Sequence, residues 1–389
     1  MRLKTQWSVR LLIATVVCLA LVGCGGNTQS TGRQDLAAEI DALFAPLTTG
    51  DSPGATVMVI RNDEVLYAAG YGSADLEHGV PITPQTPFRL ASVSKQFTSM
   101  AIMILADRGE LSYDDPMVKY LPELERFGET ITLRHLLTHT SGLPDYYDVL
   151  EEETVEGMPD TEQAIQFLAA WDEPPLFAPG ERYEYSNPGY EMLALVVERV
   201  SGQDFGRFLE DNIFAPLGMK NTVTVVRDRA PTEIPNRALG YARREGAFEL
   251  LDDHQLNYIL GSGGLYSSVE DLALWNSALD GETLVSRATL EAAWTPVELA
   301  GGETYPYGIG WRLGDYGGLG PRMCHSGHWL GFSNFLARYP AQRVTVIVLS
   351  NIEDFESEEY AGRITDLLFP STLITGATVI DGTGAPRFT

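Results

Sequence analysis

The stretch Phe88-Arg89-Leu90-Ala91-Ser92-Val93-Ser94-Lys95 decides how the rest of the chain is organised. Apolar residues follow it at helical spacing, and the segment 96–106 carries no charge, which predicts a helix that is apolar on nearly all sides. Such a helix belongs in a core, and Gly109 supplies a stop signal for it. Ser92 and Lys95 stand at its opening, one turn apart and therefore on one face.

The pairing of Ser92 with Lys95 predicts a nucleophile and its base. A serine hydroxyl is a weak nucleophile that needs a nearby base. A lysine at the mouth of an apolar helix loses water, which favours its neutral and basic form. The first N–H groups of the helix can stabilise developing negative charge. A surface Ser/Lys pair without a role has the same spacing, so the assignment depends on the rest of the chain.

Residues 1–23 are typical of a lipoprotein signal peptide. A basic segment precedes an apolar run from Leu11 to Gly23, which is short for a membrane span. The run ends in Leu21-Val22-Gly23-Cys24, which resembles the bacterial lipobox and predicts lipidation of Cys24, followed by a flexible tether over residues 24–34. An ordinary secretory signal is the alternative. The expected location is the cell envelope, periplasmic and held to a membrane by the lipid on Cys24, with the outer membrane favoured in a Gram-negative cell.

Composition restricts the partners that the chain can have. It holds 53 acidic and 27 basic residues, and a net charge of −26 argues against nucleic acid and against flat binding to anionic lipid. Of the three cysteines, Cys18 leaves with the signal and Cys24 takes the lipid, so only Cys324 remains and no internal disulfide is expected. Cys324 is interpreted as a buried core thiol. No cofactor is implied, and the oligomeric state stays open.

Residues 35–369 are predicted to form one two-lobed domain of mixed α/β (α+β) class. Strands are expected at Gly54–Arg61, Val65–Gly72, Tyr307–Leu313, Arg322–Ser326, Phe332–Tyr339 and Val344–Asn351, and helices at 34–48, 269–279 and 357–368. Helical segments dominate from about 114 to 253, which predicts a helical lobe inserted into an α/β lobe of residues 35–113 and 254–369. The strand-like tail, 370–389, is either a simple C-terminus or the start of a further domain.

Two other motifs carry side chains suited to catalysis. Tyr185-Ser186-Asn187 offers a phenol that can relay a proton and an amide that can bind a substrate amide, although a buried tyrosine and a helix-capping asparagine would give the same pattern. His325-Ser326-Gly327-His328 lies on a predicted strand. Its glycine lets a substrate approach the backbone, and the N–H of His328 can pair with the N–H of Ser92 as an oxyanion hole.

Two further patterns are interpreted as structural. The sequence Gly261-Ser262-Gly263-Gly264 is a tight backbone turn. His135 and His139 are four residues apart, but Leu136 stands where a zinc motif of this spacing needs glutamate, so no metal site is expected.

Taken together, Ser92-x-x-Lys95, Tyr185-x-Asn187 and His325-x-Gly327 resemble the motifs of the penicillin-recognising serine hydrolases. That family includes class C β-lactamases, D-Ala-D-Ala carboxypeptidases, D-aminopeptidases and related esterases. Three more stretches share the resemblance: 136–144, 307–311 and 325–332. The resemblance covers about 36–369 and implies a central antiparallel sheet covered by helices, an all-helical lobe and a site in the cleft between them.

The resemblance also implies a role for each motif residue. Ser92 is the acylating nucleophile, and Lys95 and Tyr185 share its proton and pass it to the leaving group. The N–H groups of Ser92 and His328, beside Gly327, form the oxyanion hole. Asn187 holds the substrate amide. His325 lines the leaving-group side.

The substrate expected is a small peptide, amide or ester. Class C β-lactamases usually carry lysine where this chain has His325, and an imidazole that is mostly neutral gives a β-lactam carboxylate a weaker positive charge. The favoured function is therefore hydrolysis of D-amino-acid peptides or amides, or of esters, through an acyl-enzyme on Ser92. A class C-like β-lactamase and a non-catalytic lipoprotein that binds cell-wall peptides are the alternatives. The tail resembles the opening strand of N-acyl-D-amino-acid deacylases, which would extend the same substrate class.

Overall fold

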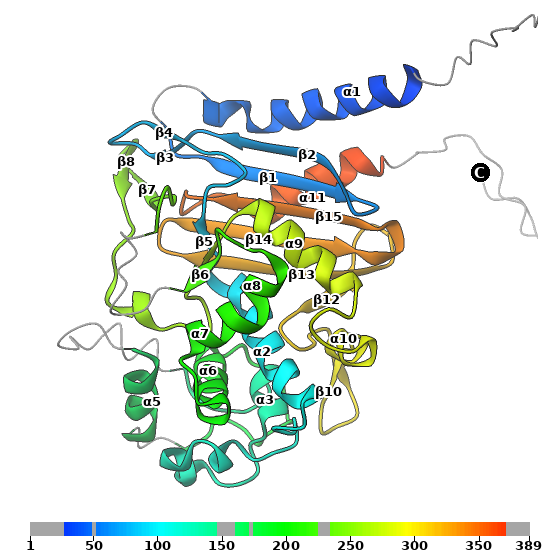
Figure 1. Cartoon of the computed structure of the whole chain (residues 1–389). Helices are drawn as coiled ribbons and strands as arrows, with labels where there is room; N and C mark the ends of the chain where they lie inside the picture. Colours follow the sequence, from blue (N-terminus) through cyan, green and yellow to red (C-terminus); the bar gives the residue numbers. More distant parts are fainter. Residues whose placement is uncertain (1–26, 49–51, 146–159, 171–173, 225–233, 371–389) are drawn as a thin grey trace, which may run out of the picture.

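The fold is given by a computed structural model that describes residues 27–48, 52–145, 160–170, 174–224 and 234–370 (Figure 1). The predictions for the signal peptide, for Cys24 and for the tail beyond residue 370 lie outside the described residues. Within them, no helix has both the length and the apolar character needed to cross a membrane.

A six-stranded antiparallel sheet forms the centre of the molecule, in the order β12-β13-β14-β15-β1-β2. Its strands are β1 (Ala55–Arg61), β2 (Glu64–Tyr71), β12 (Arg312–Asp315), β13 (Pro321–Trp329), β14 (Phe332–Tyr339) and β15 (Val344–Ser350). The predicted antiparallel run of the three last strands is confirmed. The N-terminal hairpin joins this run through β1, which pairs with β15, so the two ends of the domain share one sheet.

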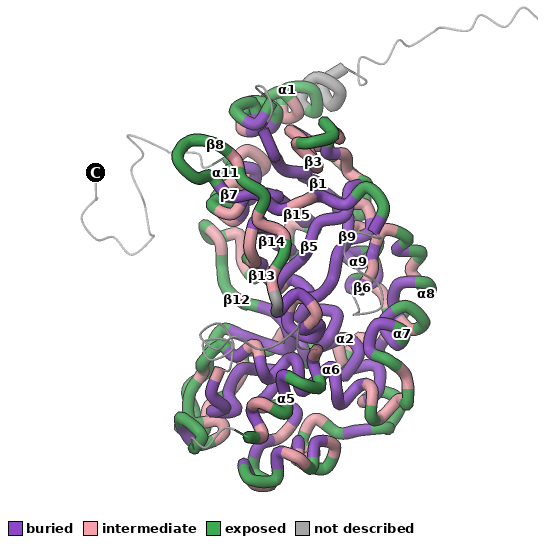
Figure 2. Tube along the Cα trace, turned by 90° about the vertical axis from the view of Figure 1, so that its left-hand side faces the viewer, coloured by how far each residue is buried: buried purple, intermediate pink, exposed green. Residues whose placement is uncertain are grey.

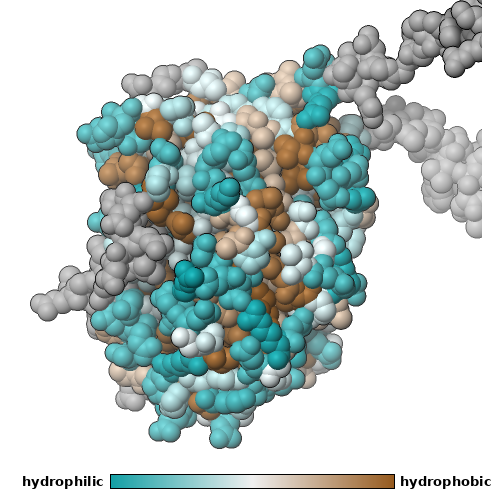
Figure 3. Space-filling model, in the orientation of Figure 1, coloured by the Kyte–Doolittle hydropathy of each residue, from teal (hydrophilic) through white to brown (hydrophobic). Residues whose placement is uncertain are grey.

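Alternate side chains of the sheet fill two separate cores. Val57 and Val59 of β1 point to the face covered by α1 (Asn27–Phe44) and α11 (Ser357–Leu368), whereas Met58 and Ile60 point to the opposite core. This alternation is the period of a strand buried on both faces. Figure 2 shows the buried residues concentrated along β1 and around α2, and Figure 3 shows a mainly hydrophilic outer face with apolar residues between the charged ones.

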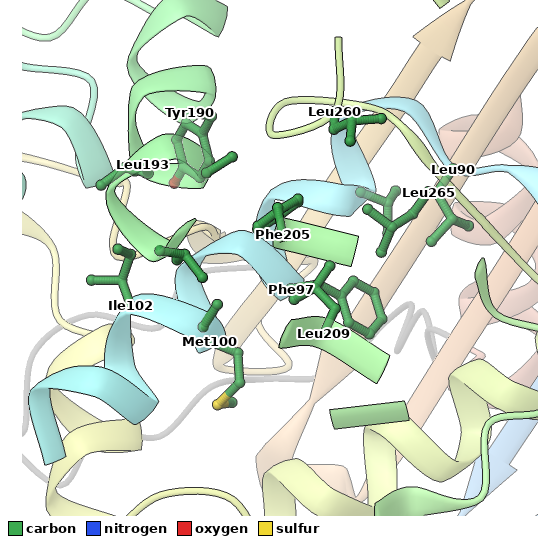
Figure 4. Packing of buried hydrophobic residues seen from close by; sticks show 14 of the residues in the cluster. Leu90, Phe97, Met100, Ile102, Tyr190, Leu193, Phe205, Leu209, Leu260 and Leu265 are labelled. Carbon is green, nitrogen blue, oxygen red and sulfur yellow. The ribbon is translucent and has the colours of Figure 1, made fainter. Parts of the chain in front are cut away.

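The helix predicted after Ser92 is α2 (Lys95–Asp107), and all its residues from Lys95 to Leu105 are buried. Phe97, Met100 and Ile102 pack in one cluster with residues of α6 (Asn187–Ser201) and α7 (Phe205–Leu209) (Figure 4). The predicted helix, apolar on nearly all sides and buried in a core, is therefore confirmed. Ser92 itself lies in a short 3-10 turn, η2 (Ala91–Ser94), and Lys95 is the first residue of the α-helix.

The remaining elements connect and cover these parts. The other helices are α3 (Leu133–Leu137), α5 (Thr161–Ala170), a π-helical turn (Glu210–Phe214), α8 (Ala215–Leu217), α9 (Val269–Asp280) and α10 (Arg287–Ala293). The 3-10 turns are Ala45–Thr48, Met117–Lys119, Pro122–Phe127, Gln255–Tyr258 and Pro340–Gln342. Short strands are β3 (Ser73–Asp75), β4 (Val80–Pro81), β5 (Phe88–Arg89), β6 (Val223–Thr224), β7 (Tyr241–Arg244), β8 (Ala247–Leu250), β9 (Leu265–Ser267), β10 (Val297–Glu298) and β11 (Thr304–Tyr305).

The structure differs from the predicted boundaries in three places. First, α1 begins at Asn27, inside the predicted tether 24–34, where the Arg33 guanidinium donates to the carbonyls of Val65 and Leu66 in β2 at 2.9 and 3.2 Å. These bonds attach the helix to the edge of the sheet, which a polar composition alone does not indicate.

The second and third differences concern strands. Among the described residues of the predicted helical range, which ends at 253, the last helix is α8 and the strands β6, β7 and β8 follow it. Of these, β6 pairs with β9, which lies beside the Ser92 segment. The predicted strand 307–313 is reduced to β12, which begins at Arg312. Gly308 explains the shift, because a Cβ there would lie 2.1 Å from the Ala293 carbonyl, so this segment packs against the end of α10.

Candidate active site

The backbone around Ser92 is packed closely against strand β13. Ala91 has a φ of 48°, in the left-handed region that residues with side chains seldom occupy. A Cβ added to Gly327 of β13 would lie 2.1 Å from the Leu90 carbonyl and 3.2 Å from the Ser92 nitrogen. The strand therefore passes directly against the nucleophile's backbone, and only glycine permits that approach.

The edge of β13 is unpaired where it faces Ser92. Its pairing with β12 ends at Cys324, whereas its pairing with β14 continues to Trp329. The strand segment from His325 onward thus has one side that β12 does not cover, and η2 packs there. His328 is exposed and lines a cavity of about 250 Å³ together with Ser92, Asn187 and Trp329. The structure thus brings the two segments predicted for the oxyanion hole together.

Lys95 is fully buried and makes three hydrogen bonds. Its Nζ lies 3.2 Å from the Ser92 Oγ, 2.8 Å from the Asn187 Oδ1 and 3.0 Å from the Ser262 carbonyl oxygen. Loss of water lowers the pKa of Lys95 to about 7, although the charges of Glu191 and Asp145 act in the opposite direction. A large share of the amine is therefore neutral near pH 7 and can take the Ser92 proton.

Tyr185 stands on the other side of the nucleophile. Its phenol hydrogen-bonds the Ser92 side chain, and the Lys95 Nζ lies 4.8 Å from the centre of its ring. The residue keeps 37% of its surface exposed, yet removal of its phenol from water raises the pKa of Tyr185 well above its ordinary value. Tyr185 is therefore a phenol at neutral pH, suited to donate or relay a proton, while Lys95 is suited to accept one.

Asn187 opens helix α6 without capping it. The N-cap is Ser186, whose Oγ accepts the N–H of Gly189 at 3.4 Å. The Asn187 side chain is instead directed to Lys95, through the 2.8 Å bond of its Oδ1. The alternative interpretation of Asn187 as a helix cap does not hold in the structure.

His325 lies in a buried chain of hydrogen bonds. Its Nδ1 is 2.7 Å from the Ser326 carbonyl, which can only accept, so that nitrogen carries the proton and Nε2 accepts from the Tyr307 hydroxyl at 3.0 Å. The Tyr307 oxygen then accepts from the His139 Nε2 at 3.1 Å, and the His139 Nδ1 accepts the Ser186 N–H at 3.1 Å. The chain His139–Tyr307–His325 links the Tyr185-Asn187 segment to β13.

This chain fixes the charge and the accessibility of His325. Burial lowers the pKa of His325 to about 3 and the pKa of His139 well below its ordinary value, so both rings stay neutral. The exposed fraction of His325 is 2%, and both its ring nitrogens are occupied. Its ring centre lies 6.3 Å from that of Tyr185, so the residue stands beside the site without offering it a free ring nitrogen, and its place on the leaving-group side stays a prediction.

Sequence reasoning missed several residues of the site. The Gly261-Ser262 turn was interpreted as structural, but the Ser262 carbonyl holds Lys95 and Ser262 lines the cavity. Glu191 is fully buried and is the first of the charges that raise the pKa of Lys95. Its spacing gave a signal, since it lies one helical turn after Asn187. Tyr307 stands in the stretch 307–311 that shares the family resemblance, but its bonds to His139 and His325 were not predicted. Among the described residues, no group of three or more His, Cys, Asp or Glu is placed to hold a metal ion.

Comparison with known proteins gives consistent results. A family model described as Beta-lactamase matches residues 40–368. Penicillin-binding protein 4* of Bacillus subtilis (strain 168) is 33% identical over 339 residues, which cover 85% of this chain and 75% of that protein. The octameric penicillin-binding protein homologue from Pyrococcus abyssi has a TM-score of 0.73 and 29% identity, over 87% of this chain and 77% of that one.

A more distant structure shares the fold alone. The D-amino acid amidase from Ochrobactrum anthropi SV3, complexed with D-phenylalanine, has a TM-score of 0.69 at 22% identity, over 87% of this chain and 98% of that one. The antiparallel sheet with its helices is thus the fold of these proteins.

Proposed function

The chain belongs to the beta-lactamase family of serine hydrolases, and from this premise we propose that it hydrolyses D-amino-acid peptides or amides, or small esters, through an acyl-enzyme on Ser92. The observation that carries the proposal is the buried Lys95, whose Nζ lies 3.2 Å from the Ser92 Oγ and whose pKa is about 7. This arrangement activates a serine without a histidine base.

Each residue of the site has a defined part in the proposed reaction. Neutral Lys95 takes the Ser92 proton as the Oγ attacks the substrate carbonyl, and the N–H groups of Ser92 and His328 stabilise the oxyanion. The phenol of Tyr185 protonates the leaving group and recovers its proton from Lys95. Deacylation runs these proton transfers in reverse: water attacks the acyl-Ser92 ester and gives its proton to Tyr185, while the Tyr185 proton passes through Lys95 to the departing Ser92 Oγ. Asn187 holds Lys95 and faces the cavity, where its amide can bind the substrate.

The charge at the His325 position disfavours a β-lactam carboxylate there, while Arg89 is the cation that lines the cavity. The strand residue His325 is neutral and buried, so it offers no fixed cation to a β-lactam carboxylate. The cavity beside Ser92 is lined partly by apolar side chains, namely Leu256, Ile259 and Trp329, which suit the side chain of an amino acid or acyl group.

β-Lactam turnover is the second candidate. The name of the Bacillus relative refers to penicillin binding, and penicillin is a cyclic amide that can acylate a serine. Slow deacylation after such acylation would make the protein a binder of penicillin without making it an efficient β-lactamase.

The test separates these activities on one protein. Wild type and Ser92→Ala are given nitrocefin, D-Ala-D-Ala peptides, D-amino-acid amides and p-nitrophenyl esters, and intact mass is measured after a fluorophosphonate or a penicillin. We expect an adduct on Ser92, turnover of the D-amino-acid amides, peptides or esters, and little turnover of nitrocefin. Equal mass spectra for wild type and Ser92→Ala after every reagent would contradict the proposal.

We also propose that the protein acts at the cell envelope, anchored by a lipid on Cys24. The support is the sequence alone, a short apolar run that ends in a lipobox-like Leu-Val-Gly-Cys. Metabolic labelling with a fatty acid, followed by membrane fractionation, should label the wild type. Labelling that persists in Cys24→Ser would contradict the anchor.

A further inference from the structure

Glu191 is a buried carboxylate beside the catalytic residues that the proposed mechanism does not use. Its exposed fraction is 0%, and it lies on α6 one turn after Asn187. Its Oε2 accepts the N–H of Gly261 at 2.7 Å, and its Oε1 accepts the N–H of Ser262 at 2.7 Å. No Lys, Arg or His nitrogen is recorded within 4 Å of it in the part of the chain that the structure describes. Burial raises the pKa of Glu191, whereas the hydrogen bonds from Ser262 and Gly261 and the charge of Lys95 act in the opposite direction and favour the carboxylate.

The turn that Glu191 holds leads directly to Lys95. The same residue that gives its N–H to Glu191, Ser262, gives its carbonyl oxygen to the Lys95 Nζ at 3.0 Å. The turn is pressed against α6, because a Cβ on Gly261 would lie 2.1 Å from the Tyr190 carbonyl. Glu191 and Lys95 are therefore joined through the backbone of one residue, Ser262.

We propose that Glu191 is a positioning residue for the base: it fixes the Gly261-Ser262 turn onto Lys95 and supplies the buried negative charge that balances Lys95 in its protonated form. The inference rests on the proposed function, since it concerns the base of the acylation step. It predicts that the charge of Glu191, as well as its shape, sets the pH at which Ser92 becomes reactive.

The groups around Lys95 leave Glu191 as the main counter-charge. Among the charges that oppose desolvation of Lys95, Glu191 comes first and Asp145 second. His139 and His325 stay neutral, and Tyr185 and Tyr190 place their rings 4.8 and 5.4 Å from the Nζ as protonated phenols. Removing the Glu191 charge therefore lowers the pKa of Lys95, and more neutral base is present at acidic pH.

The experiment measures the rate of Ser92 acylation by a fluorophosphonate between pH 5 and 9. In Glu191→Gln, the acidic limb of this profile should move to lower pH by about one unit, even if the maximum rate falls. Glu191→Asp keeps the charge, so its limb should stay near that of the wild type. Glu198→Gln is the matched control, because Glu198 lies on the same helix and its Oε1 accepts one backbone N–H, from Phe205 at 2.8 Å. The acidic limb of the Glu198→Gln profile should stay at the wild-type pH.

The outcomes distinguish the inference from the proposed function. A Glu191→Gln profile that is lowered evenly, with its limb unmoved, would show a structural role only and overturn the inference. Equal limb shifts in Glu191→Gln and Glu191→Asp would overturn it too, because charge would then not be the cause. If Glu191→Gln does not fold, as judged by its thermal melt, Glu191→Asp still decides, since a limb displaced by a full unit contradicts the charge assignment. Absence of labelling in the wild type would instead contradict the proposed function.

Discussion

Replacing Gly327 by alanine should separate catalysis from the fold. The glycine lies in β13 with an ordinary backbone conformation, so alanine brings no φ strain and acts through its Cβ alone. That Cβ would lie 2.1 Å from the Leu90 carbonyl and 3.2 Å from the Ser92 nitrogen. Since non-bonded heavy atoms pack at about 3.5 Å, the strand must move away from Leu90 by more than about 1 Å.

The expected loss follows from where that movement occurs. A displacement of about 1 Å takes the β13 N–H groups out of reach of the oxyanion, and loss of one such donor lowers kcat about 10²–10³-fold, or about 3–4 kcal/mol in transition-state free energy. The free energy of unfolding should fall by about 1–3 kcal/mol, the usual cost of overpacking. Catalysis should therefore suffer more than folding does.

The assay compares Gly327→Ala with Gly314→Ala. Gly314 lies on the neighbouring strand β12, and a Cβ there would have no heavy atom within 4 Å. Acylation of Ser92 by a fluorophosphonate and thermal unfolding are measured for both variants and the wild type. Gly314→Ala should match the wild type in both measurements. A Gly327→Ala acylation rate within about threefold of the wild-type rate would refute the close contact of β13 with the Leu90–Ser92 backbone and the oxyanion hole that depends on it.

Three further predictions concern protons. The wild-type acylation rate should rise with pH through about 7, because Lys95 acts in its neutral form; a rate independent of pH from 5 to 8 would exclude Lys95 as the base. Tyr185→Phe should lower turnover of amides about 10²–10⁴-fold while thermal stability changes little, as steady-state kinetics and melts will show. Stability should fall as pH drops from about 6.5 towards 4. His139 and His325 have lowered pKa values in the fold, so the unfolded chain binds more protons in this range, at up to about 1.4 kcal/mol per pH unit for each histidine. Melts of His325→Gln should show a shallower slope, and an unchanged slope would contradict the neutral rings.

The elements with a clear period were predictable from the sequence. The strands β14 and β15 and the helix α2 carry apolar runs whose period and length leave one interpretation, and all three were found within one or two residues. The segment 307–311 misled because its apolar and aromatic residues fit a strand, whereas Gly308 and the end of α10 determine its path. The short strand β6 pairs with the distant β9, and β7 pairs with β8 across a tight turn. These strands are too short to show an alternation of apolar and polar residues in the sequence.

The site was predictable only where its residues stand in motifs. Ser92, Lys95, Tyr185 and Asn187 were identified by spacing, and the structure brings them together around one cavity or one amine. Two of their partners stand in stretches that the sequence analysis noted without assigning them a role in the site: a carbonyl at Ser262 and a phenol at Tyr307. Their contacts depend on how distant segments pack together, which the residue types alone do not encode. The orientation of His325 is the clearest case, because the motif gives its strand position but not the two bonds that turn the ring inward.

Most ionisable side chains of the site keep one protonation state near neutral pH. His139 and His325 stay uncharged until the pH is far below neutral, and Tyr185 and Tyr307 keep their protons above pH 10. Lys95 changes charge near pH 7, and it interacts with Glu191, whose pKa is raised by burial. A change in the acidic limb of the rate therefore belongs to the Lys95–Glu191 pair. The neutral chain His139–Tyr307–His325 thus does two things at once: it holds the two sides of the cleft together, and it adds no charge that would displace the equilibrium of the base.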